Sequence, residues 1–126
     1  MKEKILFVNS CVRGDNESRT LALAKTALSR LDGDIEEIRL ADANLKPLDA
    51  AGLAKRAESA EKNDFSDPVY DCAKQFAACD TVVIAAPFWD YSFPAFFKIY
   101  IESLCVGGLT FLYGSDGVPI SYCRAK

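Results

Sequence analysis

The chain has 126 residues and a formal net charge of −3, with 50% hydrophobic and 26% charged residues, which is typical of one soluble globular domain and excludes a disordered chain. The acidic balance argues against nucleic acid as a partner, because no basic stripe is present to replace the counterions of phosphates. No apolar run approaches the ~20 residues that a membrane-spanning helix needs, and Met1 leads directly into a predicted strand rather than a signal-peptide core, so we expect a cytoplasmic protein with no membrane partner.

The first predicted elements are a strand and a helix. Residues 5–8 form a short apolar run that is typical of a buried strand. A helix is predicted over residues 18–31, with Gly33 placed to end it. The apolar residues of this helix recur at helical spacing and share one face: Leu21, Ala24, Leu28 and Leu31.

The next segment contains an edge strand and a long connection. Apolar residues alternate with charged ones over residues 35–40, which indicates a second strand at the edge of a sheet. Residues 41–66 are too many for an ordinary connection. Their middle, residues 48–60, is rich in Ala, Lys and Glu and predicts a short helix within a mobile excursion that lies near the functional site.

Two more helices flank a third strand. Asp67 followed by Pro68 is a strong helix start, with Asp as the cap and Pro in the first turn. Residues 81–84 are apolar and predict a buried strand, and Pro94 opens a helix that ends near residues 107–108. The helix after Pro68 is expected to bury Val69, Cys72, Ala73, Phe76 and Ala77.

The helix that begins at Pro94 carries more aromatic residues than one core face requires, so we expect it to have a second buried surface, such as a protein partner. Residues 117–126 resemble the approach to a fourth strand. The elements therefore alternate β-α-β-α-β-α, which predicts a parallel α/β sheet in a three-layer sandwich with right-handed crossovers.

Several nucleotide-binding motifs are absent from the first loop. Gly14 is the only glycine between Val8 and Gly33, which rules out the Gly-x-Gly-x-x-Gly dinucleotide fingerprint. The phosphate-binding Gly-x-x-x-x-Gly-Lys-Ser/Thr motif is missing as well. Asn9 and Ser10 follow the first strand where a response regulator would need acidic residues.

Cysteine and histidine usage limits the chemistry. The five cysteines form an odd set without Cys-x-x-Cys, so we expect free thiols, with Cys72 and Cys79 as buried structural residues on one helix face. Histidine is absent, which excludes Ser-His-Asp and Cys-His sites and leaves zinc only thiolates at unsuitable spacing. We therefore expect no catalytic side chain and no metal, and chemistry that is carried by a cofactor.

The loop after the first strand suits a phosphate. The helix that begins near Ser18 leaves its first backbone N–H groups unpaired, and Arg13 and Arg19 add positive charge. The alternative is that Ser18 or Asn16 simply caps the helix, an effect of about 1 kcal/mol that needs no ligand. Three hydroxyl groups lie in the same loop: those of Ser10, Ser18 and Thr20.

The loop after the third strand suits a planar ring. Phe88, Trp89 and Tyr91 follow an apolar strand at the edge where open α/β sheets bind their ligands. The alternative is an exposed loop whose aromatic residues plug the neighbouring surface. In the strand order 2-1-3-4-5 the first and third strands are neighbours at the switch point, so one ligand with a phosphate and a flat ring, such as FMN, would meet both loops.

Three segments together resemble a known family. They are Ser10 with Ser18-Arg19-Thr20, residues 85–94 with Lys98, and residues 108–113. In these segments the chain is similar to the flavodoxin-like, FMN-dependent NAD(P)H oxidoreductases, the group of azoreductases and NAD(P)H:quinone oxidoreductases. The resemblance implies a flavodoxin-like three-layer sandwich of strand order 2-1-3-4-5.

The resemblance also implies an activity. Such enzymes take a hydride from NAD(P)H, the co-substrate, onto FMN and reduce a quinone or an azo compound at the same place. They are commonly homodimers, and the helix over residues 94–104 is the candidate interface. By resemblance, phosphate binding is assigned to Ser10, Ser18, Arg19 and Thr20, and ring and ribityl contacts to Pro87, Phe88, Trp89, Asp90 and Tyr91.

The sequence supplies only three of the five strands of that order. Residues 1–126 are therefore predicted to be the N-terminal part of a flavodoxin-like domain, truncated before strand four. The third strand would then keep an unpaired edge, which predicts self-association or loss of the flavin. Two other functions stay open: a flavin-binding electron carrier, and a non-catalytic remnant without cofactor.

Overall fold

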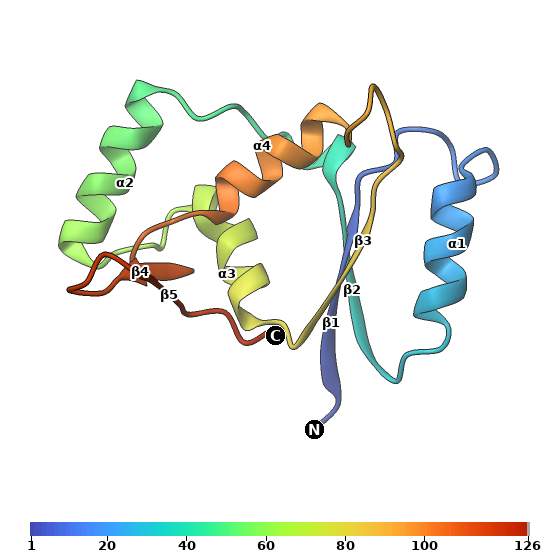
Figure 1. Cartoon of the computed structure of the whole chain (residues 1–126), viewed down its shortest axis with the longest axis horizontal. Helices are drawn as coiled ribbons and strands as arrows, with labels where there is room; N and C mark the ends of the chain where they lie inside the picture. Colours follow the sequence, from blue (N-terminus) through green and yellow to red (C-terminus); the bar gives the residue numbers. More distant parts are fainter. Residues whose placement is uncertain (126) are drawn as a thin grey trace.

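The computed structural model describes residues 1–125 and has three parallel strands at its centre (Figure 1). The strands are β1 (Glu3–Asn9), β2 (Gly33–Arg39) and β3 (Thr81–Ala85), in the order β2-β1-β3. Both neighbours of β1 run parallel to it. The predicted parallel sheet, its strand order over the first three strands and the edge position of the second strand are confirmed.

Helices cover both faces of this sheet. Ile5 and Phe7 of β1 pack under α1 (Arg19–Leu28), while Leu6 and Val8 pack on the opposite side toward α3 (Asp71–Ala78) and α4 (Ala95–Leu104). Figure 1 shows α1 on one side of the strands and α3 and α4 on the other. Because β1 is covered on both faces, its buried residues 5–8 are apolar on both sides, as is usual for a central parallel strand, and Asn9 at its end is the buried polar exception.

The first helix is shorter than predicted. It begins after Ser18 and ends at Leu28, because the Ser29 N–H bonds back to the carbonyls of Lys25 and Ala27 and closes the last turn. Leu31 is exposed and is not part of the core. Gly33 does not end the helix but opens β2, where a Cβ atom would lie 2.6 Å from the Glu3 carbonyl oxygen.

The long connection contains the predicted helix, but this helix packs on a part of the molecule other than the expected one. The connection runs through η1 (Leu40–Asp42) and α2 (Ala50–Lys62) and ends before η2 (Pro68–Tyr70). Arg56 donates to the carbonyls of Glu102 and Cys105, which fixes α2 beside the C-terminal end of α4. Figure 1 shows α2 on the side of the molecule away from α1, so the helical part of this excursion does not lie beside the first loop, although Asp42 at its start pairs with Arg39 at the end of β2.

The start of the third helical segment is confirmed, but its buried face is shifted. The Asp67 side chain accepts from the Val69 N–H at 2.9 Å, and η2 forms the first turn. Since this turn is a 3-10 helix, its three residues per turn rotate Val69 outward and Tyr70 inward. Val69 is therefore not a core residue, and Tyr70 packs edge-on against Phe65 instead.

The third strand is less buried than predicted. Within residues 1–125 no strand pairs with its outer edge, and Ile84 is 48% exposed. The expectation of an unpaired edge therefore holds for the described part of the chain.

The C-terminal segment forms a small antiparallel hairpin rather than the approach to a fourth parallel strand. Its strands are β4 (Phe111–Tyr113) and β5 (Pro119–Ser121), and Leu112 lies opposite Ile120. Tight turning is provided by Gly117, which has a φ of +78°. The hairpin is a separate sheet because its strands pair only with each other.

All five cysteines are free, as expected. Cys79 is buried and Cys72 is half-buried, but Cys79 follows the end of α3 in extended conformation, so the expectation that the two share one helix face is wrong. Among the helices of residues 1–125, none combines the length and apolar character needed to cross a membrane.

The packing of α1 predicts a clear difference between two of its leucines. Leu21 is buried against β1, whereas Leu23 is 73% exposed. We expect Leu21→Ala to lower the free energy of unfolding by about 3 kcal/mol, because it leaves a cavity in the core. Leu23→Ala is the matched control and should change stability by less than about 0.5 kcal/mol. Urea unfolding followed by circular dichroism measures both, and equal losses would contradict this packing of α1.

Candidate functional site

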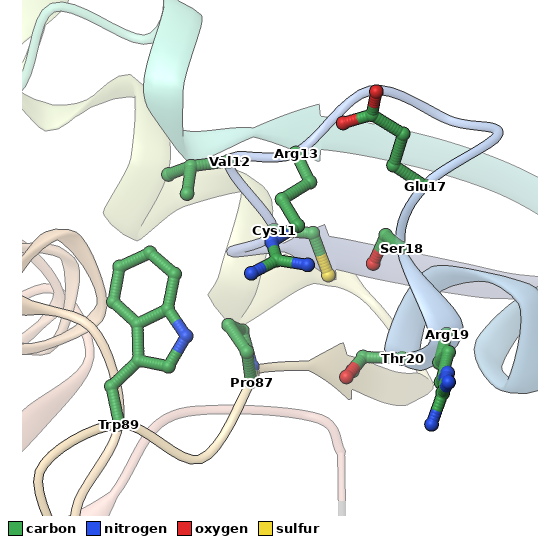
Figure 2. Close-up of a pocket in the computed structure, with 9 residues that line it drawn as sticks. All are labelled: Cys11, Val12, Arg13, Glu17, Ser18, Arg19, Thr20, Pro87 and Trp89. Carbon is green, nitrogen blue, oxygen red and sulfur yellow. The ribbon is translucent and has the colours of Figure 1, made fainter.

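The loops after β1 and β3 meet in one pocket. Both strands end at the same edge of the sheet, and the Ser10 N–H donates to the Ala85 carbonyl oxygen at 2.8 Å. The pocket has a volume of about 380 Å³ (Figure 2). Its lining combines seven residues of the first loop and helix start with two of the second loop: Cys11, Val12, Arg13, Glu17, Ser18, Arg19, Thr20, Pro87 and Trp89.

The first loop turns back at Gly14 to bring the start of α1 into the pocket. The Gly14 carbonyl accepts from the N–H groups of Glu17 and Ser18, at 2.9 and 3.2 Å. At the other end of the loop, the Cys11 N–H donates to the Asn9 side chain at 3.0 Å. These bonds shape the part of the pocket that lies in front of α1.

Ser18 caps α1, yet the helix start still offers free donors. The Ser18 Oγ accepts from the Leu21 N–H at 3.1 Å. In residues 1–125, the backbone N–H groups of Arg19 and Thr20 donate to no acceptor. Unpaired N–H groups and the positive end of the helix dipole favour an anion at this place. The cap and the anion site are therefore compatible, because capping uses only the acceptor side of the Ser18 hydroxyl.

The charges that line the pocket also favour an anion. Arg13 and Arg19 contribute two cations against the single carboxylate of Glu17. Within the described residues neither arginine forms an ion pair. Both guanidinium groups are therefore available to a ligand, and a phosphate suits them well.

The second loop makes a tight turn at residues 89–92. Trp89 and Ser92 exchange both backbone hydrogen bonds, at 2.7 and 2.8 Å. Asp90 and Tyr91 have φ values of +49° and +61°, the pattern of a type I′ turn. In Figure 2 the indole of Trp89 lies across the pocket from Ser18 and Thr20, with Pro87 between them.

The structure brings five of the nine predicted site residues together and leaves four outside the pocket. Ser10 is buried, and its Oγ has no hydrogen-bond partner among the described residues. Phe88 and Tyr91 are 76% and 94% exposed, contact each other edge to face and do not line the pocket. Asp90 shares this turn and is also exposed. The five residues that line the pocket are Ser18, Arg19, Thr20, Pro87 and Trp89.

Sequence reasoning missed three lining residues, namely Cys11, Val12 and Glu17. Their signal was position alone, since they lie in the loop that directly follows a buried strand. Side-chain chemistry did not single them out, because apolar residues and carboxylates are also common in loops that bind no ligand.

The architecture and the place of the pocket define a class of protein. A parallel sheet with helices on both faces, and a pocket outside the carboxyl ends of adjacent strands, is the arrangement of an open, doubly wound α/β protein. A family model described as a flavodoxin-like fold matches residues 3–123, and the chain belongs to that flavodoxin-like family.

Individual relatives agree with this assignment. An FMN-dependent NADH:quinone oxidoreductase of Clostridium perfringens is 30% identical over 98% of this chain and 64% of its own length. An FMN-dependent NADH:quinone oxidoreductase 2 of Clostridium acetobutylicum is 34% identical over 98% of this chain and 63% of its own length. The chain therefore spans slightly less than two thirds of these relatives.

Solved structures share the fold. An FMN-dependent NADH-azoreductase from Bacillus anthracis str. Ames Ancestor, in complex with FMN, matches with a TM-score of 0.74 and 21% identity over 94% of this chain and 62% of that one. An azoreductase from Bacillus anthracis str. Sterne matches with a TM-score of 0.71 and 24% identity over the same shares.

The turn at residues 89–92 predicts a stabilising substitution. A left-handed backbone is unfavourable for a residue with a Cβ atom by about 1–2 kcal/mol, and Tyr91 adopts it. We expect Tyr91→Gly to raise the free energy of unfolding by about 0.5–1 kcal/mol, after the greater flexibility of unfolded glycine is subtracted. Tyr91→Ala removes the ring but keeps the Cβ, so it should give no such gain. Urea unfolding compares the variants, and a gain for both would assign the effect to the ring.

Proposed function

We propose that the pocket binds FMN, with the phosphate at the start of α1 and the ring against the loop after β3. The observation that carries this proposal is the meeting of the two loops in one pocket, with donors and cations on one side and Trp89 and Pro87 on the other. A mononucleotide with one anionic end and one flat aromatic end matches this division.

The donor set at the start of α1 suits a phosphate monoester. The free N–H groups of Arg19 and Thr20 and the hydroxyls of Ser18 and Thr20 can donate to its oxygens, and Arg13 and Arg19 supply opposite charge. The buried Ser10 hydroxyl lacks a partner among the described residues. A buried hydroxyl without a partner is unfavourable, and because Ser10 does not line the pocket, contact with a phosphate oxygen requires a shift of the loop or a bridging water.

The loop after β3 offers the ring one apolar wall. Pro87 and Trp89 line the pocket, so we propose that they contact the isoalloxazine ring first. Phe88, Asp90 and Tyr91 lie outside the lining, and contacts from them require the ring or its ribityl chain to extend along the turn. Backbone N–H groups of such a turn can bond the polar edge of a ring while an indole packs on its face.

We further propose that the chain takes part in electron transfer from NAD(P)H to a quinone or azo acceptor. Bound FMN supplies this chemistry, since a flavin accepts a hydride and passes on its electrons. The side chains of this chain bind and orient the flavin, and no nucleophile is needed, in keeping with a sequence that lacks histidine. The support for the activity is that these relatives are FMN-dependent NADH:quinone oxidoreductases, of which this chain spans about 64%.

Self-association and a cytoplasmic location complete the proposal. Phe93 and Phe96 are exposed beside the start of α4, although Tyr100 and Leu104 of the same helix are buried. Exposed neighbouring aromatic residues are frequent in protein interfaces, so this part of α4 is the proposed homodimer contact. The five free thiols fit a reducing compartment.

The proposal predicts a direct optical signal. Trp89 is the only tryptophan in the chain, so its fluorescence reports on the pocket alone. We expect FMN to quench this emission in a saturable way, and we expect the loaded protein to oxidise NADH when a quinone is added. Quenching without NADH oxidation would indicate an electron carrier. No quenching at millimolar FMN would contradict the proposed site.

The phosphate assignment has its own test in Ser18→Asp. Aspartate is as good a helix cap as serine, so α1 should persist, but the added carboxylate repels a phosphate. We expect FMN affinity to fall at least about tenfold while riboflavin, which has no phosphate, binds as before. Ser66→Asp makes the same charge change on an exposed loop outside the pocket lining and should leave both affinities unchanged. Equal losses for FMN and riboflavin would place the phosphate elsewhere.

A further inference from the structure

We propose that Asp15 is a positioning residue for the anion site, a role that rests on the proposed binding of a phosphate in the pocket. Its carboxylate lies between Arg39, at the end of β2, and Lys25 of α1, and it holds the loop of residues 10–18 in the shape that presents the start of α1 to the ligand. Asp15 itself does not line the pocket.

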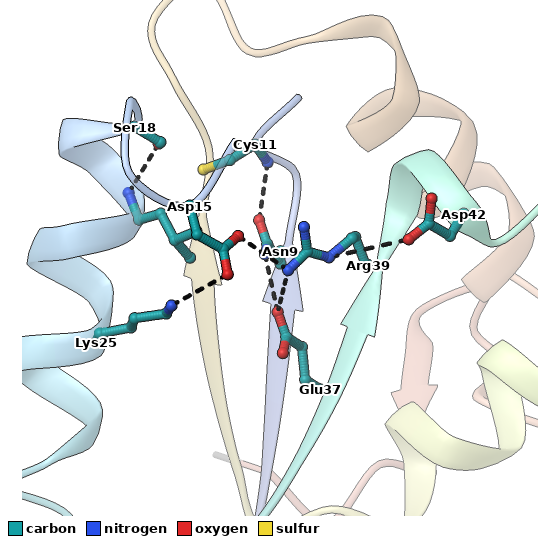
Figure 3. A network of polar contacts seen from close by, with 9 residues as sticks. Asn9, Cys11, Asp15, Ser18, Lys25, Glu37, Arg39 and Asp42 are labelled. Atoms are coloured by element: carbon teal, nitrogen blue, oxygen red, sulfur yellow. Dashed lines mark hydrogen bonds and ion pairs between the residues drawn. The ribbon is translucent and has the colours of Figure 1, made fainter. Parts of the chain in front are cut away.

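The Asp15 carboxylate uses both of its oxygens. Oδ1 accepts from Arg39 Nη2 at 3.2 Å, and Oδ2 lies 3.5 Å from Lys25 Nζ (Figure 3). The three residues belong to the first loop, to β2 and to α1. One side chain therefore ties the middle of the loop to the sheet on one side and to the helix that follows on the other.

A second connection holds the beginning of the same loop. Asn9 is fully buried, accepts from the Cys11 N–H at 3.0 Å and donates to Glu37 Oε1 at 2.8 Å. Glu37 Oε1 also lies 3.9 Å from Arg39 Nη2. Figure 3 shows this continuous network, in which the end of β2 contacts the loop directly through Arg39 and Asp15, and indirectly through Glu37 and Asn9 of β1.

The middle of the loop depends on these side chains. Over residues 12–16, no backbone N–H group bonds to any of the described residues. Without Asp15, the backbone hydrogen bonds that hold the loop are those of the Ser10 and Cys11 N–H groups at its beginning and those of the Gly14 carbonyl to Glu17 and Ser18. Arg13, which lines the pocket, lies in this weakly held stretch, so the position of its charge depends on the Asp15 contacts.

The charges of the network favour an ionised Asp15. The hydrogen bond from Arg39, followed by the positive charge of Lys25, holds the pKa of Asp15 below its usual range. Asp15 also raises the pKa of Arg39. All three groups are half-exposed or exposed, and exposed ion pairs contribute little to stability. The network is therefore better suited to fixing a loop conformation than to stabilising the fold.

Positioning and simple electrostatics predict opposite results for Asp15→Asn. Removing a negative charge near a phosphate should tighten FMN binding if only long-range charge matters. If Asp15 positions the loop, FMN should bind roughly fivefold more weakly, which is the value of one well-placed hydrogen bond, while riboflavin affinity stays unchanged. Trp89 quenching measures both ligands. FMN binding by Asp15→Asn that is equal to or tighter than that of the parent would overturn the proposal.

Two further variants make the result specific. Asp34→Asn removes the same charge from an exposed pair with Lys2, at the opposite end of the sheet, and should change neither affinity. Arg39→Gln should weaken FMN binding as Asp15→Asn does, and the double variant should be no weaker than either single one. Additive losses would mean that the two residues act separately and would also overturn the proposal.

Hydrogen exchange separates failure of this proposal from failure of the proposed function. In the ligand-free parent chain, the amides of residues 10–18 should exchange more slowly than in Asp15→Asn, and Asp34→Asn should match the parent. If exchange is faster in Asp15→Asn but the parent chain binds no FMN, the role of Asp15 in holding the loop stands and the flavin site is refuted. Unchanged exchange together with unchanged FMN affinity would refute the positioning role while the flavin site stands.

Discussion

The pairing of β1 with β3 is the constraint on which the candidate site depends. Their ladder places Asn9 opposite Ala85, and the Ser10 N–H extends it by one more bond to the Ala85 carbonyl. Because the two strands are parallel, the chain leaves both at the same edge of the sheet, and the two following loops must lie side by side. The pocket is therefore a consequence of strand order, in which β1 is central and buries Leu6 and Val8 on one face and Phe7 on the other.

The start of α1 shows how a structural role and a binding role can share one residue. Ser18 fixes the helix start by accepting from the Leu21 N–H, and this decides which backbone donors remain unpaired. Those donors belong to Arg19 and Thr20, and both residues line the pocket. In the sequence, a cap and a ligand site are competing interpretations of Ser18. In the structure, the cap creates the donor arrangement that a ligand would use.

The sequence predicts what depends on local pattern and misses what depends on backbone conformation. The strand order, the cap at Ser18 and the pairing of the two loops follow from periodicity, cap chemistry and topology. Sequence reasoning did not show that Tyr91 lies outside the pocket lining, because positive φ values normally call for Gly or Asn, and residues 90–91 are neither. Val69 was misplaced since a 3-10 turn has the same sequence signals as an α-helical start but a different period. The small hairpin was missed because strands of three residues carry almost no periodic signal.

The ion pairs around Asp15 have a role that a stability argument overlooks. Half-exposed pairs in water contribute little to the free energy of unfolding, and their removal would pass unnoticed in a denaturation experiment. Binding is more sensitive, because a loop that is ordered only when the ligand arrives loses conformational entropy at that moment and weakens the affinity. A loop held beforehand by β2 and α1 avoids most of this loss. Arg39 therefore acts by restricting the conformations of the loop. Its effect on free energy would appear in ligand affinity and not in the free energy of unfolding.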